Sequence, residues 1–368
     1  MALYQKTHPN VKISGEFADP AGFLLKLPVL FRSNSAPDVL NVAESWIAPL
    51  DAQFHPFADL RPYMAKSHMS QDNYLKGTWT PTEIGGKIYA VPKIIYGDAV
   101  AYNIDLFRKY HVPFPKAGWT TKDFLRDAKA LTHGSGANKT WGVAQPFGSM
   151  NIAQLFGGQL FDYKKGKMLA TNLLVERAVQ FQMDLMLKYK VMPAALVTPN
   201  TISPFLTGRA AMDMTWVSYL QDSWTSQIGS RFKWAIAPFP ADWHGVLQAN
   251  YTAIAQASPN KAAAWQFVQW VSTDPAAMKI LGVFSSPAYL PALKQWMAHP
   301  PATWALVDRA ATIAAVPRSP YDYDGGVYTQ IWTRFGTALQ KMQRGAPVKQ
   351  TLHSFQQEGQ QVIDRAQR

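Results

Sequence analysis

The sequence of 368 residues contains no cysteine, so the chain has no disulfide bond, no thiolate nucleophile and no cysteine metal site. It also lacks an apolar run of the roughly 18 to 20 residues that span a bilayer. The first ten residues, MALYQKTHPN, lack the charged start, the apolar stretch and the cleavage site of a signal peptide. A chain without cysteine is compatible with an oxidising compartment.

Motifs that indicate catalysis or metal binding are also missing. The eight histidines are spread singly from His8 to His353, which favours structural or surface roles over metal ligation. The stretch HGSGANKTWG lacks the order of a phosphate loop, and DYDGG lacks the carboxylate of a calcium loop, because Thr333 stands at its twelfth position. Carboxylates distant in sequence can still meet, so a glycoside hydrolase remains an alternative. We predict no enzyme, no metal and no cofactor.

Charge and aromatic content suggest what the chain binds. Lys and Arg outnumber Asp and Glu by 36 to 24, a net charge of +12, but the basic residues are scattered, as in LFRKYH. Nucleic-acid-binding proteins cluster such residues, so we expect no nucleic-acid partner. An acidic or anion-rich medium explains the excess of basic residues equally well. The 13 Trp, 15 Tyr and 19 Phe mostly predict packed cores. Several Trp in turn-like contexts also suit a cleft that stacks rings on a ligand.

Strand and helix patterns alternate along the chain, which predicts the α/β class. A strand is expected at 11–17, a helix bent by Pro28 at 20–33, and a short buried strand at 39–42 that runs into a loop. Two strands are expected within 85–107, and Thr120 should cap the following helix with Asp123 in a capping box. Ser258 is the expected cap of another helix, and two helices are expected at 327–342 and 348–366.

Four segments, in order, carry a resemblance to a known family. They are APDVLNVAESW, GGKIYAVPKIIYGDAVAYNIDLFRKYHVPFPKAGWTTKDF, FLTGRAAMDMTW and AIAQASPNKAAAWQFVQWVST. Each motif alone is loose, but the ordered set resembles the extracytoplasmic solute-binding proteins of carbohydrate ABC importers, of the maltose-binding-protein-like type. The resemblance covers nearly the whole chain.

The resemblance implies a periplasmic-binding-protein-like fold, in which two α/β lobes are joined by a hinge with a ligand cleft between them. Chain crossings are expected near Tyr102 and Asn103, near 250–252 and near 313–318, where they absorb the hinge rotation. One lobe would contain residues 1–102 and 252–312, and the other residues 103–251 and 313–368.

Ligand-binding residues are expected in loops beyond the carboxyl ends of strands, as open α/β sheets generally arrange them. Aromatic rings pack against the C–H faces of a sugar, whereas acids and amides bond its hydroxyls. The resemblance adds most weight to 44–46, to Tyr96 and to the segment after AAM, while ordinary packing is an equal alternative for Phe147 and Trp243. The candidates are Glu44, Ser45, Trp46, Tyr96, Asp98, Phe147, Trp216, Tyr219, Trp243, Gln248, Asn250, Tyr321, Tyr323 and Asp324.

The function implied by the resemblance is capture of a sugar or oligosaccharide and its delivery to the membrane permease subunits of an ABC transporter. We expect a monomer in the periplasm or another extracytoplasmic location. The same fold could instead bind glycerol-3-phosphate, another polyol or a polyamine. A phosphate would require basic residues such as Lys93, Arg209 or Arg318.

The start of the chain departs from the family. The stretch YQKTHPNVKI matches the end of the family's first helix, yet it begins four residues from Met1. The first strand and most of the first helix are therefore missing relative to the family. A misplaced start codon, a fragment or a degenerate protein would each explain this, and we expect the native gene product to extend upstream and to carry the signal peptide there.

Overall fold

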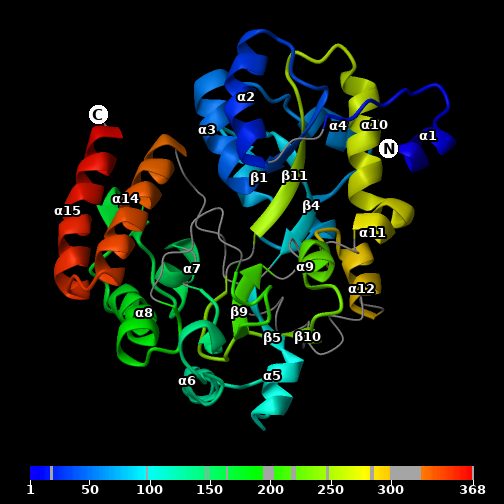
Figure 1. Cartoon of the computed structure of the whole chain (residues 1–368). Helices are drawn as coiled ribbons and strands as arrows, with labels where there is room; N and C mark the ends of the chain where they lie inside the picture. Colours follow the sequence, from blue (N-terminus) through cyan, green and yellow to red (C-terminus); the bar gives the residue numbers. More distant parts are fainter. Residues whose placement is uncertain are drawn as a thin grey trace. The chain divides into compact units, whose positions relative to one another are not determined.

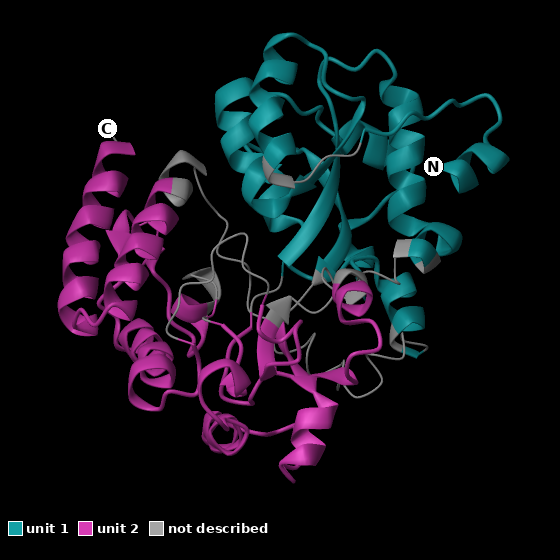
Figure 2. Ribbon diagram, viewed as in Figure 1, with its two compact units in different colours: residues 1–95, 248–299, 321–325 teal, residues 96–247, 300–320, 326–368 magenta. Residues whose placement is uncertain are grey.

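The computed structural model describes residues 1–16, 20–96, 98–145, 147, 149–162, 165–193, 203–216, 221–245, 248–281, 286–298 and 325–366. Figure 1 shows the elements along the chain, and Figure 2 shows that they form two compact units. Unit 1 contains the described residues of 1–95 and 248–299 and Gly325, and unit 2 contains those of 96–247 and 326–368.

Unit 1 is built on a four-stranded sheet of order β1-β11-β4-β12. Its strands are β1 Val39–Ala43, β4 Ala90–Tyr96, β11 Gln248–Ile254 and β12 Ser286–Pro287. β1 and β11 run antiparallel, from the pair Val39 and Ile254 to the pair Ala43 and Asn250. Alternate residues of β1 such as Leu40 and Val42 are fully buried, which places the core on the faces of this sheet.

Helices cover the unit 1 sheet. Its helices are α1 Ala2–Thr7, α2 Pro20–Arg32, α3 Glu44–Phe54, α4 Arg61–Lys66, α10 Lys261–Thr273, α11 Pro275–Leu281 and α12 Leu290–Ala298. Figure 1 shows α2 and α3 on one side of β1 and β11, and α10 on the other. A small hairpin joins β2 Glu83–Ile84 to β3 Lys87–Ile88. Its turn requires glycine because Gly85 and Gly86 both have positive φ, at 55° and 73°.

Unit 2 has a second four-stranded sheet, of order β10-β5-β9-β6. Its strands are β5 Asp98–Asn103, β6 Trp141–Val143, β9 Ala210–Trp216 and β10 Trp234–Ala237. The neighbours of β5 are antiparallel to it, whereas β6 runs parallel to β9. The helices of unit 2 are α5 Ile104–Lys109, α6 Thr121–Ala130, α7 Ser149–Gln154, α8 Leu173–Met183, α9 Gln221–Ile228, α14 Gly325–Gln343 and α15 Val348–Ala366.

Several predictions from the sequence are confirmed. The class is α/β, and α14 and α15 are the two expected final helices. The capping box of α6 is present: Thr120 Oγ1 accepts from the Asp123 N–H at 3.4 Å, and Asp123 Oδ2 accepts from the Thr120 N–H at 3.0 Å. Pro28 lies inside α2, as expected.

Three local predictions are wrong. Residues 11–16 form no strand, because the Val11 N–H turns back to the His8 carbonyl. No loop follows β1, since α3 begins directly at Glu44, where an acidic side chain interacts favourably with the helix dipole. Ser258 does not cap α10, whose N-cap is Asn260; the Ser258 hydroxyl instead donates to Asp38.

The two compact units divide at 95/96 and 247/248. The reason is strand pairing: β5 bonds β9 and β10 of unit 2 along its length, and β11 bonds β1 of unit 1 from Asn250 onward. The third expected crossing, at 313–318, lies outside the described residues. Of the helices that the structure describes, none combines the length and the hydropathy needed to cross a bilayer.

Candidate functional site

Three predicted polar residues come together in unit 1, where β1 ends and β11 begins. Ala43 lies opposite Asn250, so Glu44, at the start of α3, lies beside the first residues of β11. The Glu44 carboxylate accepts a hydrogen bond from the Ala249 N–H at 3.3 Å. Glu44, Gln248 and Asn250 are each less than one-tenth exposed. This cluster, called the Glu44 group below, concentrates one acid and two amides at one end of the unit 1 sheet.

Two more predicted residues lie in the first turn of α3. Ser45 and Trp46 are half-buried, so each keeps part of its side chain accessible. Trp46 stands two residues after Glu44 in the chain, and its indole is not part of the buried core of unit 1. An aromatic ring, an acid and amides are the groups that recognise a sugar face and its hydroxyls.

In unit 2, Asp98 is the first residue of β5 and lies opposite Trp216, the last residue of β9. Asp98 is buried. A Cβ atom added at Gly245 would lie 3.5 Å from the Cβ atom of Asp98. The chain around 245 therefore approaches Asp98 closely. The side chains of Tyr96 and Trp216 are not described, and Tyr219, Tyr321, Tyr323 and Asp324 lie outside the described residues.

Phe147 and Trp243 are packed inside unit 2, which is the alternative that the sequence left open for them. Both are 4 % exposed, with ring centroids 5.6 Å apart. The Trp243 ring also lies 4.8 Å from that of Phe124, and its indole N–H donates to Thr121 Oγ1 at 2.7 Å. These two side chains pack in the aromatic core of unit 2, and their role in ligand binding stays a prediction.

A buried acid that the sequence analysis missed lies in the middle of β9. Asp213 is fully buried, and its Oδ2 accepts from Ser203 Oγ at 2.8 Å and from Gln145 Nε2 at 3.3 Å. Burial raises the pKa of Asp213 to about 7, although hydrogen bonds from Ser203, Gln145 and the Met214 N–H act in the opposite direction. Its signal in the sequence is a single acid inside the apolar run AAMDMTW.

Of the basic residues considered for a phosphate, Lys93 lies near the Glu44 group, because its partner Asn41 lies opposite Thr252, two residues from Asn250. Lys93 Nζ donates to Asn41 Oδ1 at 2.8 Å, and burial lowers the pKa of Lys93 to about 8. Arg209 is exposed and precedes β9, whereas Trp216 ends it, so about 20 Å of strand separates them. Arg318 lies outside the described residues. Within the described ranges, no group of three His, Asp or Glu side chains could hold a metal ion.

Comparisons with known proteins identify the fold. A family model described as bacterial extracellular solute-binding protein matches residues 1–278. An ABC substrate-binding protein from Listeria monocytogenes, solved in complex with cycloalternan, is 21% identical and superposes with a TM-score of 0.83 over 99% of this chain and 94% of its own.

Two further solved structures are similar. UgpB from Mycobacterium tuberculosis, in complex with glycerophosphocholine, is 18% identical with a TM-score of 0.82, over 100% of this chain and 94% of its own. The sugar-binding protein MalE from Xanthomonas citri is 17% identical with a TM-score of 0.79, over 100% and 93% of the two chains. The expected periplasmic-binding-protein-like fold is confirmed by these superpositions.

Proposed function

Because the chain belongs to the bacterial extracellular solute-binding protein family, we propose that it is the substrate-binding component of an ABC importer for a sugar or oligosaccharide. The observation that carries the proposal is the Glu44 group, a buried carboxylate and two buried amides followed by the half-buried ring of Trp46. A carboxylate accepts hydrogen bonds and side-chain amides both donate and accept them, which suits the hydroxyls on the rim of a sugar.

The proposed action involves binding and no chemical step. The ligand binds to the side chains of the Glu44 group and Trp46 in unit 1. A ligand that binds one conformation better shifts the population toward it. The importer's permease subunits then recognise the loaded form. The protein works as a monomer outside the cytoplasm, in keeping with the extracellular character of its family.

A phosphorylated polyol is the second candidate, and the glycerophosphocholine complex of the Mycobacterium tuberculosis relative is the observation in its favour. A phosphate ligand needs cations or helix N-termini close by. Among the described residues, Lys93 is the one of these cations that lies near the Glu44 group, and Arg209 lies at the far end of β9 from Trp216. One lysine supplies fewer partners for a phosphate than the acid and two amides of the Glu44 group supply for hydroxyls, so the neutral hydroxyl-rich ligand has the stronger support.

A thermal-shift panel tests the proposal. Mono- and disaccharides, longer maltooligosaccharides, polyols and glycerol-3-phosphate are each added to the protein at increasing concentrations. A ligand present at one hundred times its Kd stabilises the folded protein by about 2.7 kcal/mol, which raises the melting temperature measurably. A shift with a sugar supports the proposal. A shift confined to glycerol-3-phosphate would favour the second candidate, and the absence of any shift would contradict both.

Trp46→Ala is expected to weaken sugar binding about tenfold, because it removes one ring that packs against the ligand. The melting temperature without ligand should change little, since Trp46 is only half-buried. Isothermal titration of the sugar found in the panel measures the loss. Trp46→Phe is the matched control and should retain most of the affinity, because it keeps an aromatic face. Equal affinity of Trp46→Ala and the wild type would remove Trp46 from the site.

A further inference from the structure

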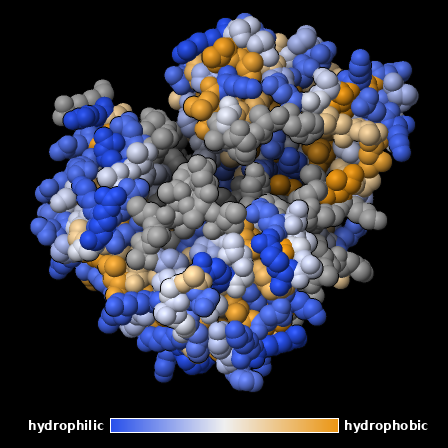
Figure 3. All heavy atoms as spheres, in the orientation of Figure 1, coloured by the Kyte–Doolittle hydropathy of each residue, from blue (hydrophilic) through white to orange (hydrophobic). Residues whose placement is uncertain are grey.

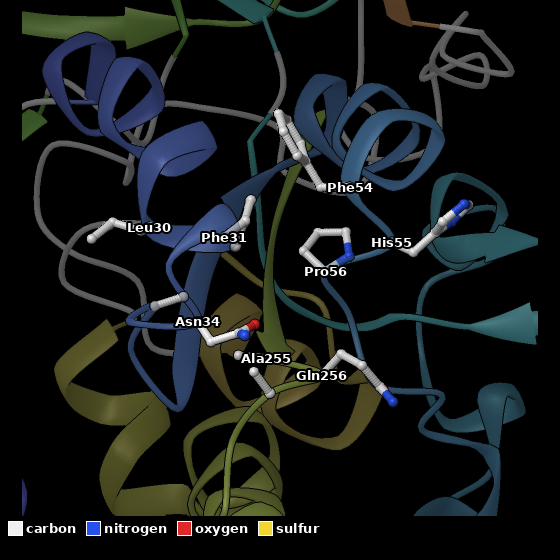
Figure 4. Close-up of a pocket in the computed structure, with 10 residues that line it drawn as sticks. Leu30, Phe31, Asn34, Phe54, His55, Pro56, Ala255 and Gln256 are labelled. Carbon is white, nitrogen blue, oxygen red and sulfur yellow. The ribbon is translucent and has the colours of Figure 1, made fainter.

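A pocket of about 450 Å³ lies within unit 1, away from the Glu44 group. Figure 4 shows that it is lined by the ends of α2 and α3 and by the chain just after β11. Ala255 and Gln256 follow β11, whereas Gln248 begins it. The seven residues of that strand span about 23 Å, so the pocket and the Glu44 group lie at opposite ends of it.

The floor of the pocket is held by backbone hydrogen bonds. Residues 56–58 run antiparallel to 254–256: the Gln256 N–H donates to the Pro56 carbonyl at 2.7 Å, and the Ala58 N–H donates to the Ile254 carbonyl at 2.9 Å. The wall is held by ring packing, with the centroid of Phe31 5.9 Å from Phe54 and 6.2 Å from Phe57. A pocket with a bonded floor and a packed wall is already formed without a ligand.

The lining combines apolar surface with two amides. Phe31, Phe54 and Pro56 supply apolar ring surface, and Asn34 and Gln256 are exposed amides of the lining; Figure 4 shows the Asn34 amide directed toward Ala255 and the Gln256 amide directed away from Asn34. Asn34 is fixed in a left-handed conformation, with φ of 51°, as the chain turns after α2. Side-chain amides can each donate and accept, and they suit hydroxyl groups, which do the same.

The pocket lining supplies no Asp, Glu, Lys or Arg side chain to pair with an ionic ligand. His55 is the single ionisable residue of the lining, and Figure 4 shows its ring directed away from the other side chains. No carboxylate lines the pocket, so a cation would lack a counter-charge, and the Arg32 guanidinium, 5.3 Å from the centroid of Phe54, would repel it. The carboxyl ends of α2 and α3 carry partial negative charge and disfavour an anion.

A neutral ligand with both an apolar face and hydroxyls remains. We propose that this pocket is a second carbohydrate site, which holds one sugar ring on Phe31, Phe54 and Pro56 and bonds its hydroxyls through Asn34 and Gln256. The volume falls in the range of ordinary small-molecule pockets and admits a ligand of that size. The site does not depend on the proposed importer function, because none of its residues belongs to the Glu44 group.

Nuclear magnetic resonance of the side-chain amides tests the proposal on the whole chain. Methyl α-D-glucopyranoside is titrated to about 50 mM, which reaches millimolar dissociation constants. We expect saturable shifts of the Asn34 and Gln256 amide signals. Ala257→Trp fills the pocket from an exposed position and should abolish the Asn34 shift. Gln256→Ala should weaken the glucoside binding reported by Asn34 about fivefold, through loss of one hydrogen bond.

Two matched variants separate this site from others. Gln53→Ala changes an exposed residue of α3 outside the lining, and Glu44→Gln changes the group at the other end of β11. Both should leave the shifts of Asn34 and Gln256 unchanged. The proposal is overturned if these signals do not move, or if the Asn34 shift persists in Ala257→Trp. Tighter binding of nicotinamide, a planar neutral amide, than of the glucoside would overturn the carbohydrate class.

Discussion

Trp243→Ala is expected to lower the free energy of unfolding by about 3–5 kcal/mol, the usual cost of removing a large buried ring. The indole is 4 % exposed and packs against Phe124, Phe147, Phe181 and Phe239, at centroid distances of 4.8 to 6.0 Å. Its N–H bond to Thr121 would also be lost. Urea denaturation followed by circular dichroism measures the change.

Trp243→Phe is the matched control, because it keeps ring packing and removes the bond to Thr121. A loss of about 1–2 kcal/mol is expected for this variant. The core role of Trp243 would be contradicted if Trp243→Ala kept the stability of the wild type and lost only its affinity for sugar. That outcome would support the ligand role that the sequence predicted for this residue.

The stability of the wild type should fall as the pH rises from about 4 to 7, as a result of Asp213. Burial raises the pKa of Asp213 from 3.8 to about 7 in the folded chain. Between these values the folded state holds a proton that the unfolded state has released, so stability decreases with pH by up to about 1.4 kcal/mol per unit from this group. The contribution is fully present below pH 3.8 and is lost once the pH exceeds 7.

Asp213→Asn should remove this slope, because an amide does not titrate and its oxygen can still accept from Ser203 and Gln145. The difference in unfolding free energy between variant and wild type should therefore shift in favour of the variant by about 4 kcal/mol from pH 4 to pH 8. Urea denaturation at five pH values gives the two curves.

Asp364→Asn is the matched control, since Asp364 is an exposed acid of α15. Its curve should run parallel to that of the wild type. Parallel curves for Asp213→Asn and the wild type would show that the Asp213 carboxyl is not protonated in the folded state near neutral pH, which would contradict the effect of burial described above.

Local sequence signals were sufficient where a short stretch of chain fixes its own structure. The capping box of α6 involves only Thr120 and Asp123, three residues apart, and it was predicted correctly. The ordered motifs also identified the family, because each includes turn glycines, prolines or helix starts that keep their spacing in the chain. Gly208, with φ of 77°, ends one such turn directly before β9.

The candidate site was only partly predictable. Glu44, Gln248 and Asn250 were proposed separately, and the sequence contained no sign that the Ala249 N–H bonds the Glu44 carboxylate across 205 positions. Asp213 was missed because its hydrogen-bond partners, Ser203 and Gln145, lie on other segments of unit 2. The sequence left open whether the rings of Phe147 and Trp243 contact a ligand or pack in the core. The structure shows how the two rings pack against one another.

The sequence by itself determined the α/β class, the family and most helices, because periodicity, caps and turn residues act between positions close in the chain. The tertiary structure decided which strands share a sheet, where the two units divide, and which polar and aromatic side chains are buried. Those outcomes depend on contacts between distant segments, such as β1 with β11 and β5 with β9, and burial there sets both the pKa of Asp213 and the role of Trp243.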